Sequence, residues 1–183
     1  VDVQYTRTVP GAKQLDPAPV VLLAQTEAGY EHLMKLNSCL YLRGDGQLPH
    51  VTVDELSVHS DGVICLTGGA LGPVGMLLQQ KQGPAARALM ERLHHIFEDR
   101  LYVELQRHPG DEGAPGEERL TERGFVEMAY EMGIPLVATN DAYFPKTEMY
   151  EAHDALICIA EGAYVDQQQP RQHLPRLMLP RCR

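Results

Sequence analysis

Polar residues that could bind metal or take part in catalysis follow a short apolar run in the second half of the chain. Residues 134–138 come after a break at Gly133 and are typical of a buried parallel strand. Thr139, Asn140 and Asp141 come directly after this run. Catalytic and ligand-binding side chains of α/β proteins lie at such C-terminal strand ends. Asp141 is therefore a candidate metal ligand.

A second candidate carboxylate lies near the end of another expected strand, residues 101–106. Glu104 alternates with Tyr102 and Gln106, so the three side chains should share one face of the strand. Glu104 could serve as a metal ligand or general base at the mouth of a barrel. It could equally be a solvated or salt-bridged residue on a polar edge. The sequence leaves both interpretations open.

Four glycines, at positions 68, 69, 72 and 75, lie between an expected strand and a short helix that begins near Pro73. Such a loop can bind phosphate at a helix N-terminus. However, this one matches neither G-x-G-x-x-G nor G-x-x-x-x-G-K-[ST], and it contains no Lys. We interpret it as a tight strand-to-helix turn.

The eight histidines show no H-x-H or H-E-x-x-H pattern of a metal site. His94 and His95 are adjacent on an expected helix, where their side chains diverge by about 100° and cannot chelate one ion. His153 is interpreted as a packing or hydrogen-bonding residue. No nucleophile elbow, kinase motif or basic stretch with interleaved aromatic residues is evident.

Strand and helix signals alternate along the chain. Strands are expected at 1–5, 20–24, 62–66, 101–106 and 134–138, and helices after Thr26 and Thr52, at 84–98 and 120–132, and from Thr147. The apolar positions expected to face inward include Tyr30, Met34 and Tyr41 in the first helix, Ala86, Leu89, Met90, Leu93 and Phe97 in the third, and Leu156 and Ile159 in the last. This alternation predicts an α/β fold with mostly parallel strands in a sheet or barrel.

Composition narrows the class of protein. The chain has 183 residues, 44% of them apolar, and a formal net charge of −9. This charge argues against a generic basic DNA-binding module. The four cysteines are scattered, which favours free thiols in a reducing, cytoplasmic compartment. No signal peptide and no apolar run of about 18 residues is present, so no membrane contact is predicted.

The two ends of the sequence differ in character. The chain starts at Val1, without an initiator Met and in a strand-like pattern, so we expect a fragment of a longer protein. After Asp166, four arginines occur with no acidic residue, and prolines recur at 170, 175 and 180. We therefore expect a folded domain over residues 1–166 and an irregular tail rich in Pro and Arg over residues 167–183.

Five segments together resemble the bacterial DNA polymerase III alpha-subunit family, in the order of that family. They are residues 22–33, 62–69, 102–107, 137–141 and 151–156. The matching region is the PHP (polymerase and histidinol phosphatase) domain. The resemblance implies part of a distorted (β/α)7 barrel, placed ahead of the palm, fingers and thumb of the polymerase.

The resemblance also implies a trinuclear metal site at the barrel mouth, and five of its ligand positions can be compared with this chain. Asp2 falls where the family usually has Glu, and Asp141 keeps the ligand type. Pro19 falls at a His position, Gly69 at the Cys of a Ser-Gly-Cys turn, and Tyr143 at the His of Asp-x-His. Three ligands are therefore lost, and a multinuclear centre needs its complete ligand shell. No catalytic, cofactor or metal site is expected in this segment.

Two functions follow from the resemblance. The first is a metal-poor scaffold within a DNA-directed DNA polymerase, which contacts the remainder of the subunit, a proofreading or other replisome subunit and, through the parent protein, DNA. The parent polymerase would use Mg. The alternative is an active phosphoesterase, a 3′–5′ exonuclease or pyrophosphatase with Zn or Mn, in which Glu104, His108 or Asn140 replaces the lost ligands. A third reading sets the resemblance aside and treats the chain as a generic α/β barrel enzyme.

Overall fold

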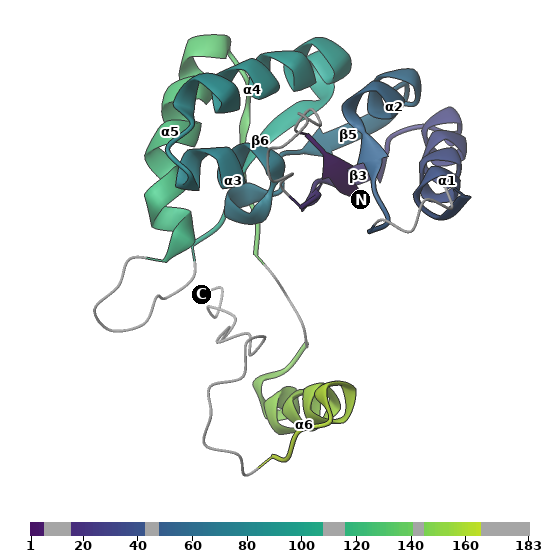
Figure 1. The fold of residues 1–183 in the computed structure, drawn as a ribbon, viewed down its shortest axis with the longest axis vertical. Coiled ribbons are helices and arrows are strands. Elements are labelled where there is room, and N and C mark those ends of the chain that lie inside the picture. Colours follow the sequence, from purple (N-terminus) through teal and green to yellow (C-terminus); the bar gives the residue numbers. More distant parts are fainter. Residues whose placement is uncertain (6–15, 43–47, 108–115, 141–144, 166–183) are drawn as a thin grey trace, which may run out of the picture. The chain divides into compact units, whose positions relative to one another are not determined.

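The structure is a computed structural model, shown in Figure 1, that describes residues 1–5, 16–42, 48–107, 116–140 and 145–165. It divides into two units. The first comprises Val1–Gln106 and Pro115–Thr139, and the second comprises Arg107–Ala114 and Asn140–Arg183. Each unit is described by itself below.

The strands of the first unit form two sheets. Their bounds are β1 (Asp2–Gln4), β2 (Ala18–Pro19), β3 (Val21–Ala24), β4 (Val51–Thr52), β5 (Val63–Leu66), β6 (Leu101–Leu105) and β7 (Leu136–Ala138). One sheet has the order β2-β1-β4 and the other β3-β5-β6-β7. The pairs β1-β4, β5-β6 and β6-β7 are parallel. This confirms the predicted α/β fold with parallel strands, although the pairs β1-β2 and β3-β5 are antiparallel.

The extended segment at 18–24 connects the two sheets. Its first part, β2, pairs antiparallel with β1, and its second part, β3, pairs antiparallel with β5. Val20 lies between them, is 1% exposed, and exchanges backbone hydrogen bonds of 2.9 and 3.0 Å with Val1. The described strands therefore follow one another in the order β4, β1, β2/β3, β5, β6 and β7.

The helices pack beside these strands. Their bounds are α1 (Glu27–Leu42), α2 (Val53–Val58), α3 (Pro73–Gln79), α4 (Gly83–Phe97), α5 (Glu117–Met132) and α6 (Tyr150–Glu161), with 3-10 turns η1 (Gly69–Leu71), η2 (Glu98–Arg100) and η3 (Thr147–Met149). In the first unit α3, α4 and α5 contact one another, whereas α1 packs against β3 and β5 (Figure 1).

Local sequence signals predicted several elements correctly. All five apolar positions predicted to face inward in α4 are buried. Thr52 and Glu55 form a capping box at the start of α2, in which each side chain bonds the other residue's backbone N–H. The Thr26 hydroxyl accepts from Gly29 at the start of α1. Gly133 ends α5 in the left-handed conformation.

The predicted burial was wrong for several apolar residues of the first unit. The strand β7 is parallel to β6 as predicted, but Leu136 is 39% exposed, and only Ile134, just before the strand, is buried. Among the described strands β7 pairs on one side alone, which leaves it at the edge. In α1, Tyr30, Met34 and Tyr41 are exposed although they share the helical spacing of the buried Leu36.

The second unit contains η3 and α6, and its apolar face also differs from the prediction. Leu156 and Ile159 were predicted to face inward, but they are 65% and 78% exposed, whereas Cys158 is buried. A helical repeat shows which residues share a face, but it does not show which element covers that face. The predicted tail, from 167 onward, lies outside the described residues.

The described cysteines agree with the expectation of free thiols. Cys39, Cys65 and Cys158 are free thiols, and Cys182 lies outside the described residues. Among the helices that the structure describes, none is both long and apolar enough to cross a membrane.

A close backbone contact fixes α1 against the turn that precedes β5. The Gly62 carbonyl accepts hydrogen bonds from the backbone N–H groups of Gln25 at 2.8 Å and Thr26 at 3.3 Å. A Cβ atom on Gly29 would lie 1.9 Å from the same carbonyl oxygen. Position 29 therefore requires glycine, since any side chain would separate the helix from the turn.

Replacing Gly29 with Ala should lower the free energy of unfolding by about 1–3 kcal/mol, because the added methyl group overlaps the Gly62 carbonyl. Urea denaturation measures this change. Gly83→Ala is the matched control, since a Cβ at Gly83 meets nothing within 4 Å. That control should leave stability unchanged or raise it by less than about 1 kcal/mol. Equal effects of the two substitutions would contradict the assigned role of Gly29.

Candidate functional site

The carboxyl ends of β5, β6 and β7 meet at one edge of the sheet. The Thr67 N–H donates to the carbonyl of Tyr102 at 3.1 Å, and the Thr139 N–H donates to that of Leu105 at 3.1 Å. These bonds continue the parallel ladders past the last strand residues. They place Thr67, Gln106 and Thr139, which follow three different strands, at the same edge.

Glu104 is the central side chain of this edge. It is 4% exposed. Its Oε2 accepts from the Gly68 N–H at 3.1 Å, and its Oε1 accepts from the Thr139 hydroxyl and, at 3.4 Å, from Gln106 Nε2. The Glu104 N–H donates to Thr67 Oγ1 at 3.0 Å. Glu104 is therefore buried, and among the described residues its partners are neutral donors and no ion pair is formed. This differs from the interpretation of Glu104 as a solvated or salt-bridged residue.

These hydrogen bonds are charge-assisted, and such bonds contribute roughly 1.5–3 kcal/mol each. The charge also affects a neighbouring thiol. Burial, and to a smaller extent the Glu104 carboxylate, raises the pKa of Cys65 to about 12. Cys65 is therefore a protonated thiol at neutral pH.

The glycine-rich segment forms a tight turn beside this carboxylate, as predicted. Gly68 and Gly69 have φ values of 78° and 57°, in the left-handed region that favours glycine. A Cβ on Gly68 would lie 2.1 Å from the Pro19 carbonyl oxygen, whereas the nearest atom to a Cβ on Gly69 would be Gln106 Oε1 at 3.6 Å. Pro19 and the two glycines therefore lie at the same edge as Glu104.

The structure brings together three of the five positions compared with the family ligands. Asp2 is exposed and lies opposite Pro19 in the antiparallel pair β1-β2. Pro19 contacts the turn that contains Gly69. Asp141 and Tyr143 lie outside the described residues.

The three proposed substitute ligands do not lie together in the part of the chain that the structure describes. Glu104 is at the edge, His108 lies outside the described residues, and Asn140 is exposed and belongs to the second unit. Sequence reasoning did not find the contacts of Glu104 with Gly68 and Thr139. These residues are 36 and 35 positions away from Glu104, so no local spacing could have indicated them.

The donor atoms that the structure describes at this edge do not by themselves fit a multinuclear metal centre. Pro19 and Gly69 have no side-chain donor, and both carboxylate oxygens of Glu104 already accept hydrogen bonds. Within the described ranges, no group of three or more His, Cys, Asp or Glu side chains is placed so that it could hold a metal ion, and a multinuclear centre needs at least that many ligands. Asp2 is the remaining carboxylate among the described ligand positions.

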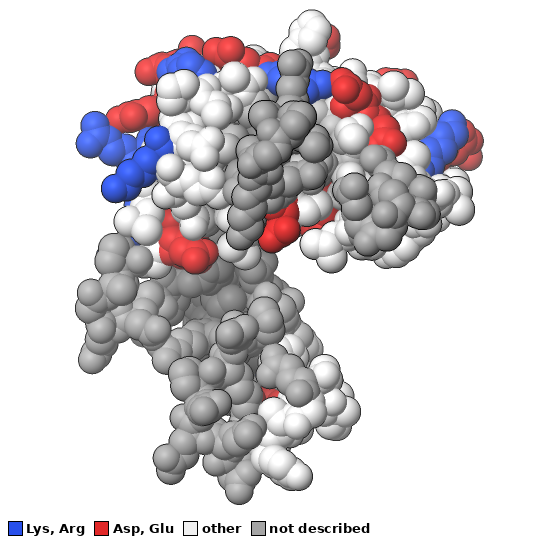
Figure 2. Space-filling model, viewed as in Figure 1, with Lys and Arg blue, Asp and Glu red and all other residues white. Residues whose placement is uncertain are grey.

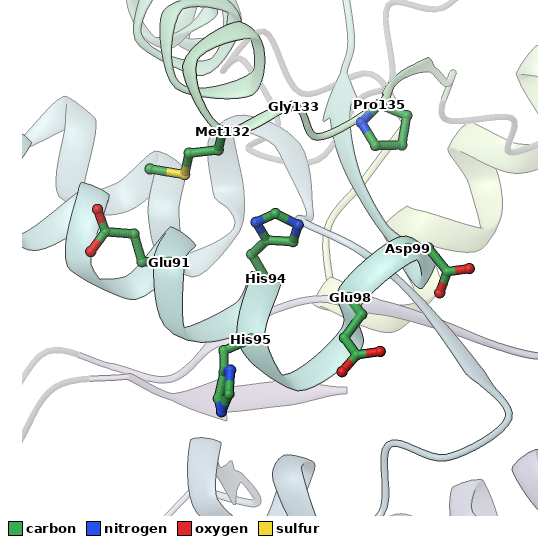
Figure 3. A pocket seen from close by; sticks show the side chains of 8 residues that line it. All are labelled: Glu91, His94, His95, Glu98, Asp99, Met132, Gly133 and Pro135. Atoms are coloured by element: carbon green, nitrogen blue, oxygen red, sulfur yellow. The ribbon is translucent and has the colours of Figure 1, made fainter.

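A pocket of about 660 Å³ lies elsewhere in the first unit, at the C-terminal end of α4. Figure 3 shows His94 and His95 pointing in different directions there, which confirms that they cannot chelate one ion together. Met132 and Pro135 contribute apolar atoms to the lining. None of the residues at the carboxyl edge lines this pocket.

Basic and acidic side chains are mixed on the surface of the first unit that is in view (Figure 2). Ion pairs such as Arg87–Glu131, between α4 and α5, and Arg92–Asp54, between α4 and α2, use some of these basic side chains. This agrees with the net charge of −9.

Residues 1–108 match the family model described as the PHP domain. The match covers more than half of the chain, and the chain belongs to the PHP domain family. The matched range contains the strands β1 to β6 and the glycine turn.

The curated relatives are much longer proteins. The chain is 44% identical over 158 residues to "DNA polymerase III subunit alpha" of Caulobacter vibrioides, a match that covers 85% of this chain and 13% of that protein. Proteins with the same name from Rickettsia bellii and Haemophilus influenzae are 36% and 34% identical, over 79% and 90% of this chain. The chain spans 12–14% of the length of these three relatives.

Replacing Glu104 with Gln should lower the free energy of unfolding by about 1–3 kcal/mol. The amide has one acceptor oxygen, while donors approach Glu104 from both Gly68 and Thr139. Chemical denaturation at neutral pH provides the measurement. Glu91→Gln, at an exposed position of α4, is the matched control and should change stability by no more than about 0.5 kcal/mol. If the two variants are equally stable, the buried network does not hold the strand ends.

Proposed function

We propose that this chain is the PHP segment of a bacterial replicative DNA polymerase III alpha subunit and that it serves there as a structural scaffold. The observation that carries the proposal is the hydrogen bonding of the buried Glu104 carboxylate. The carboxylate at the strand ends accepts hydrogen bonds from neutral groups of the protein, which joins three strands and the glycine turn. In a metal-dependent phosphoesterase, carboxylates in such a place would face the metal ions.

The residues at the family's ligand positions support the same proposal. Pro19 and Gly69 offer no lone pair from a side chain, and the phenol of Tyr143 is a poorer ligand than imidazole. Asp2 and Asp141 would remain as isolated carboxylates. We propose that they are vestiges of a metal site and that no metal step occurs in this segment.

The wider architecture is also part of the proposal. The strand succession from β4 to β7 would be part of a distorted (β/α)7 barrel, with the glycine turn and Glu104 at its mouth. Residues 1–166 would form this PHP segment and residues 167–183 an irregular tail.

The longer polypeptide would carry the nucleotidyl-transfer chemistry. The name of its relatives, "DNA polymerase III subunit alpha", supports a DNA-directed DNA polymerase activity. We propose in addition that this activity uses Mg, lies in other domains and takes place in the cytoplasm. The partners of the PHP segment would be the remainder of the subunit and a proofreading or other replisome subunit. Contact with DNA would occur through the parent protein.

The test uses the longest natural polypeptide that contains this chain. Purified protein is dialysed against Zn or Mn, and bound metal is counted by mass spectrometry; a single-stranded DNA substrate and pyrophosphate report phosphoesterase activity. The proposal expects that neither metal binding nor hydrolysis depends on Asp141, so Asp141→Asn should match the unaltered protein in both measurements. Asp99→Asn, at an exposed position, is the control for a general charge effect.

The alternative phosphoesterase would be established by either of two results. One is a stoichiometric Zn or Mn ion that is lost in Asp141→Asn and kept in Asp99→Asn. The other is hydrolysis of DNA or pyrophosphate that is lost and kept in the same two variants. A positive control comes from restoring the ligands in one variant that combines Pro19→His, Gly69→Cys and Tyr143→His. A Cβ at Gly69 meets nothing closer than 3.6 Å, so the thiol has room, although the φ of 57° adds strain. This variant should bind more metal than the unaltered protein.

A further inference from the structure

Two histidines far apart in the sequence form a pair on the first unit. His32 lies on α1, and His59 is the residue that ends α2. Their ring centroids are 5.6 Å apart, and the ring planes are tilted by 50°. Two imidazoles that share one tetrahedral metal ion at about 2.0–2.1 Å have ring centres roughly 5 Å apart. The pair is therefore close to the separation that a shared ion requires.

The orientation of His32 suits a metal ligand. Its Nδ1 lies 2.9 Å from the Asp61 carbonyl oxygen, which can only accept, so Nδ1 is the protonated nitrogen. The Nε2 atom consequently carries the lone pair. Metal-bound histidines are typically oriented in this way, with the second ring nitrogen donating to a backbone carbonyl.

The scaffold under the pair is fixed by independent contacts. The turn with Asp61 and Gly62 is held by the hydrogen bonds from Gln25 and Thr26 to the Gly62 carbonyl. Arg100 donates to the carbonyls of Ser60 and Val63 on either side of that turn. Little conformational freedom would be lost on binding, and such preorganisation favours affinity.

Burial and nearby charged side chains act on His59. Burial, followed by the nearby His32 and Lys35, lowers the pKa of His59, whereas Glu55 acts in the opposite direction. A metal ion binds the neutral form of an imidazole ring. Lys35 on α1 opposes a cation at this place and Glu55 on α2 favours it.

We infer that His32 and His59 form a two-imidazole site for a divalent late transition-metal ion such as Zn²⁺, Ni²⁺ or Cu²⁺. Imidazole nitrogen is a preferred ligand of these ions. Solvent ligands complete the coordination shell. A bound ion links α1 to the end of α2 and stabilises the folded chain by mass action.

This site is separate from the carboxyl edge. His59 and Asp61 precede β5, whereas Thr67 and Gly68 follow it, so the two sites lie at opposite ends of the same strand. Its test is independent of the proposed scaffold function, because no ligand at one site belongs to the other.

Isothermal titration calorimetry with ZnCl₂ or NiCl₂ on the full chain tests the inference. One ion per chain should bind, and His59→Asn should weaken the affinity at least tenfold. His32→Asn should do the same, because the Asn amide can still donate to the Asp61 carbonyl but lacks a nitrogen in the place of Nε2. His94→Asn is the control and should bind as the unaltered chain does. The affinity should fall as pH is lowered from about 7.5 to about 5.5, since protons compete for the ring nitrogens.

Two further measurements on the unaltered chain keep the test decisive if a variant fails to fold. The electron paramagnetic resonance spectrum of bound Cu²⁺ should show coupling to two imidazole nitrogens. Zn²⁺ should protect His32 and His59, but not His94 and His95, from acylation by diethyl pyrocarbonate. Absence of binding, equal affinity in the His59→Asn variant, or equal labelling of all four histidines with and without Zn²⁺ would overturn the inference.

Discussion

The buried carboxylate of Glu104 is the interaction on which the arrangement of the carboxyl edge depends. A carboxylate that is 4% exposed must be fully hydrogen-bonded, since its desolvation is otherwise costly. Its partners come from the turn after β5, the end of β6 and the end of β7. One side chain therefore joins three strand ends. The glycine turn follows from the same constraint, because the Gly68 N–H reaches Glu104 only where the backbone is left-handed and close to Pro19.

The hydrogen bonds of Glu104 give a physical reason why the strand ends can stay joined in the proposed scaffold without a metal centre. Carboxylates near one another at a strand edge repel unless cations or hydrogen-bond donors compensate their charge. Here a backbone N–H, a hydroxyl and an amide compensate Glu104 directly. The strand ends can therefore remain joined with Pro19 and Gly69 at positions that the PHP resemblance assigns to metal ligands.

Local patterns predicted those features that depend on neighbours in the sequence. The inward face of α4, the capping box at Thr52 and the end of α5 at Gly133 each involve residues within a few positions, and all are confirmed. Burial failed where a distant element decides it. The apolar run at 134–138 forms a parallel strand, yet it is an edge strand, and its hydrophobicity alone could not show which side another strand would cover.

The sequence by itself determined the alternation of strands and helices, the family resemblance, and the loss of side-chain donors at Pro19 and Gly69, because each is a property of residue type and order. Only the tertiary structure decided that Glu104 is buried and satisfied by Gly68 and Thr139, because those partners are more than 30 positions away. The approach of His32 to His59 was decided in the same way. It exists because α1 docks on the Gly62 turn through a contact that only a glycine at position 29 allows.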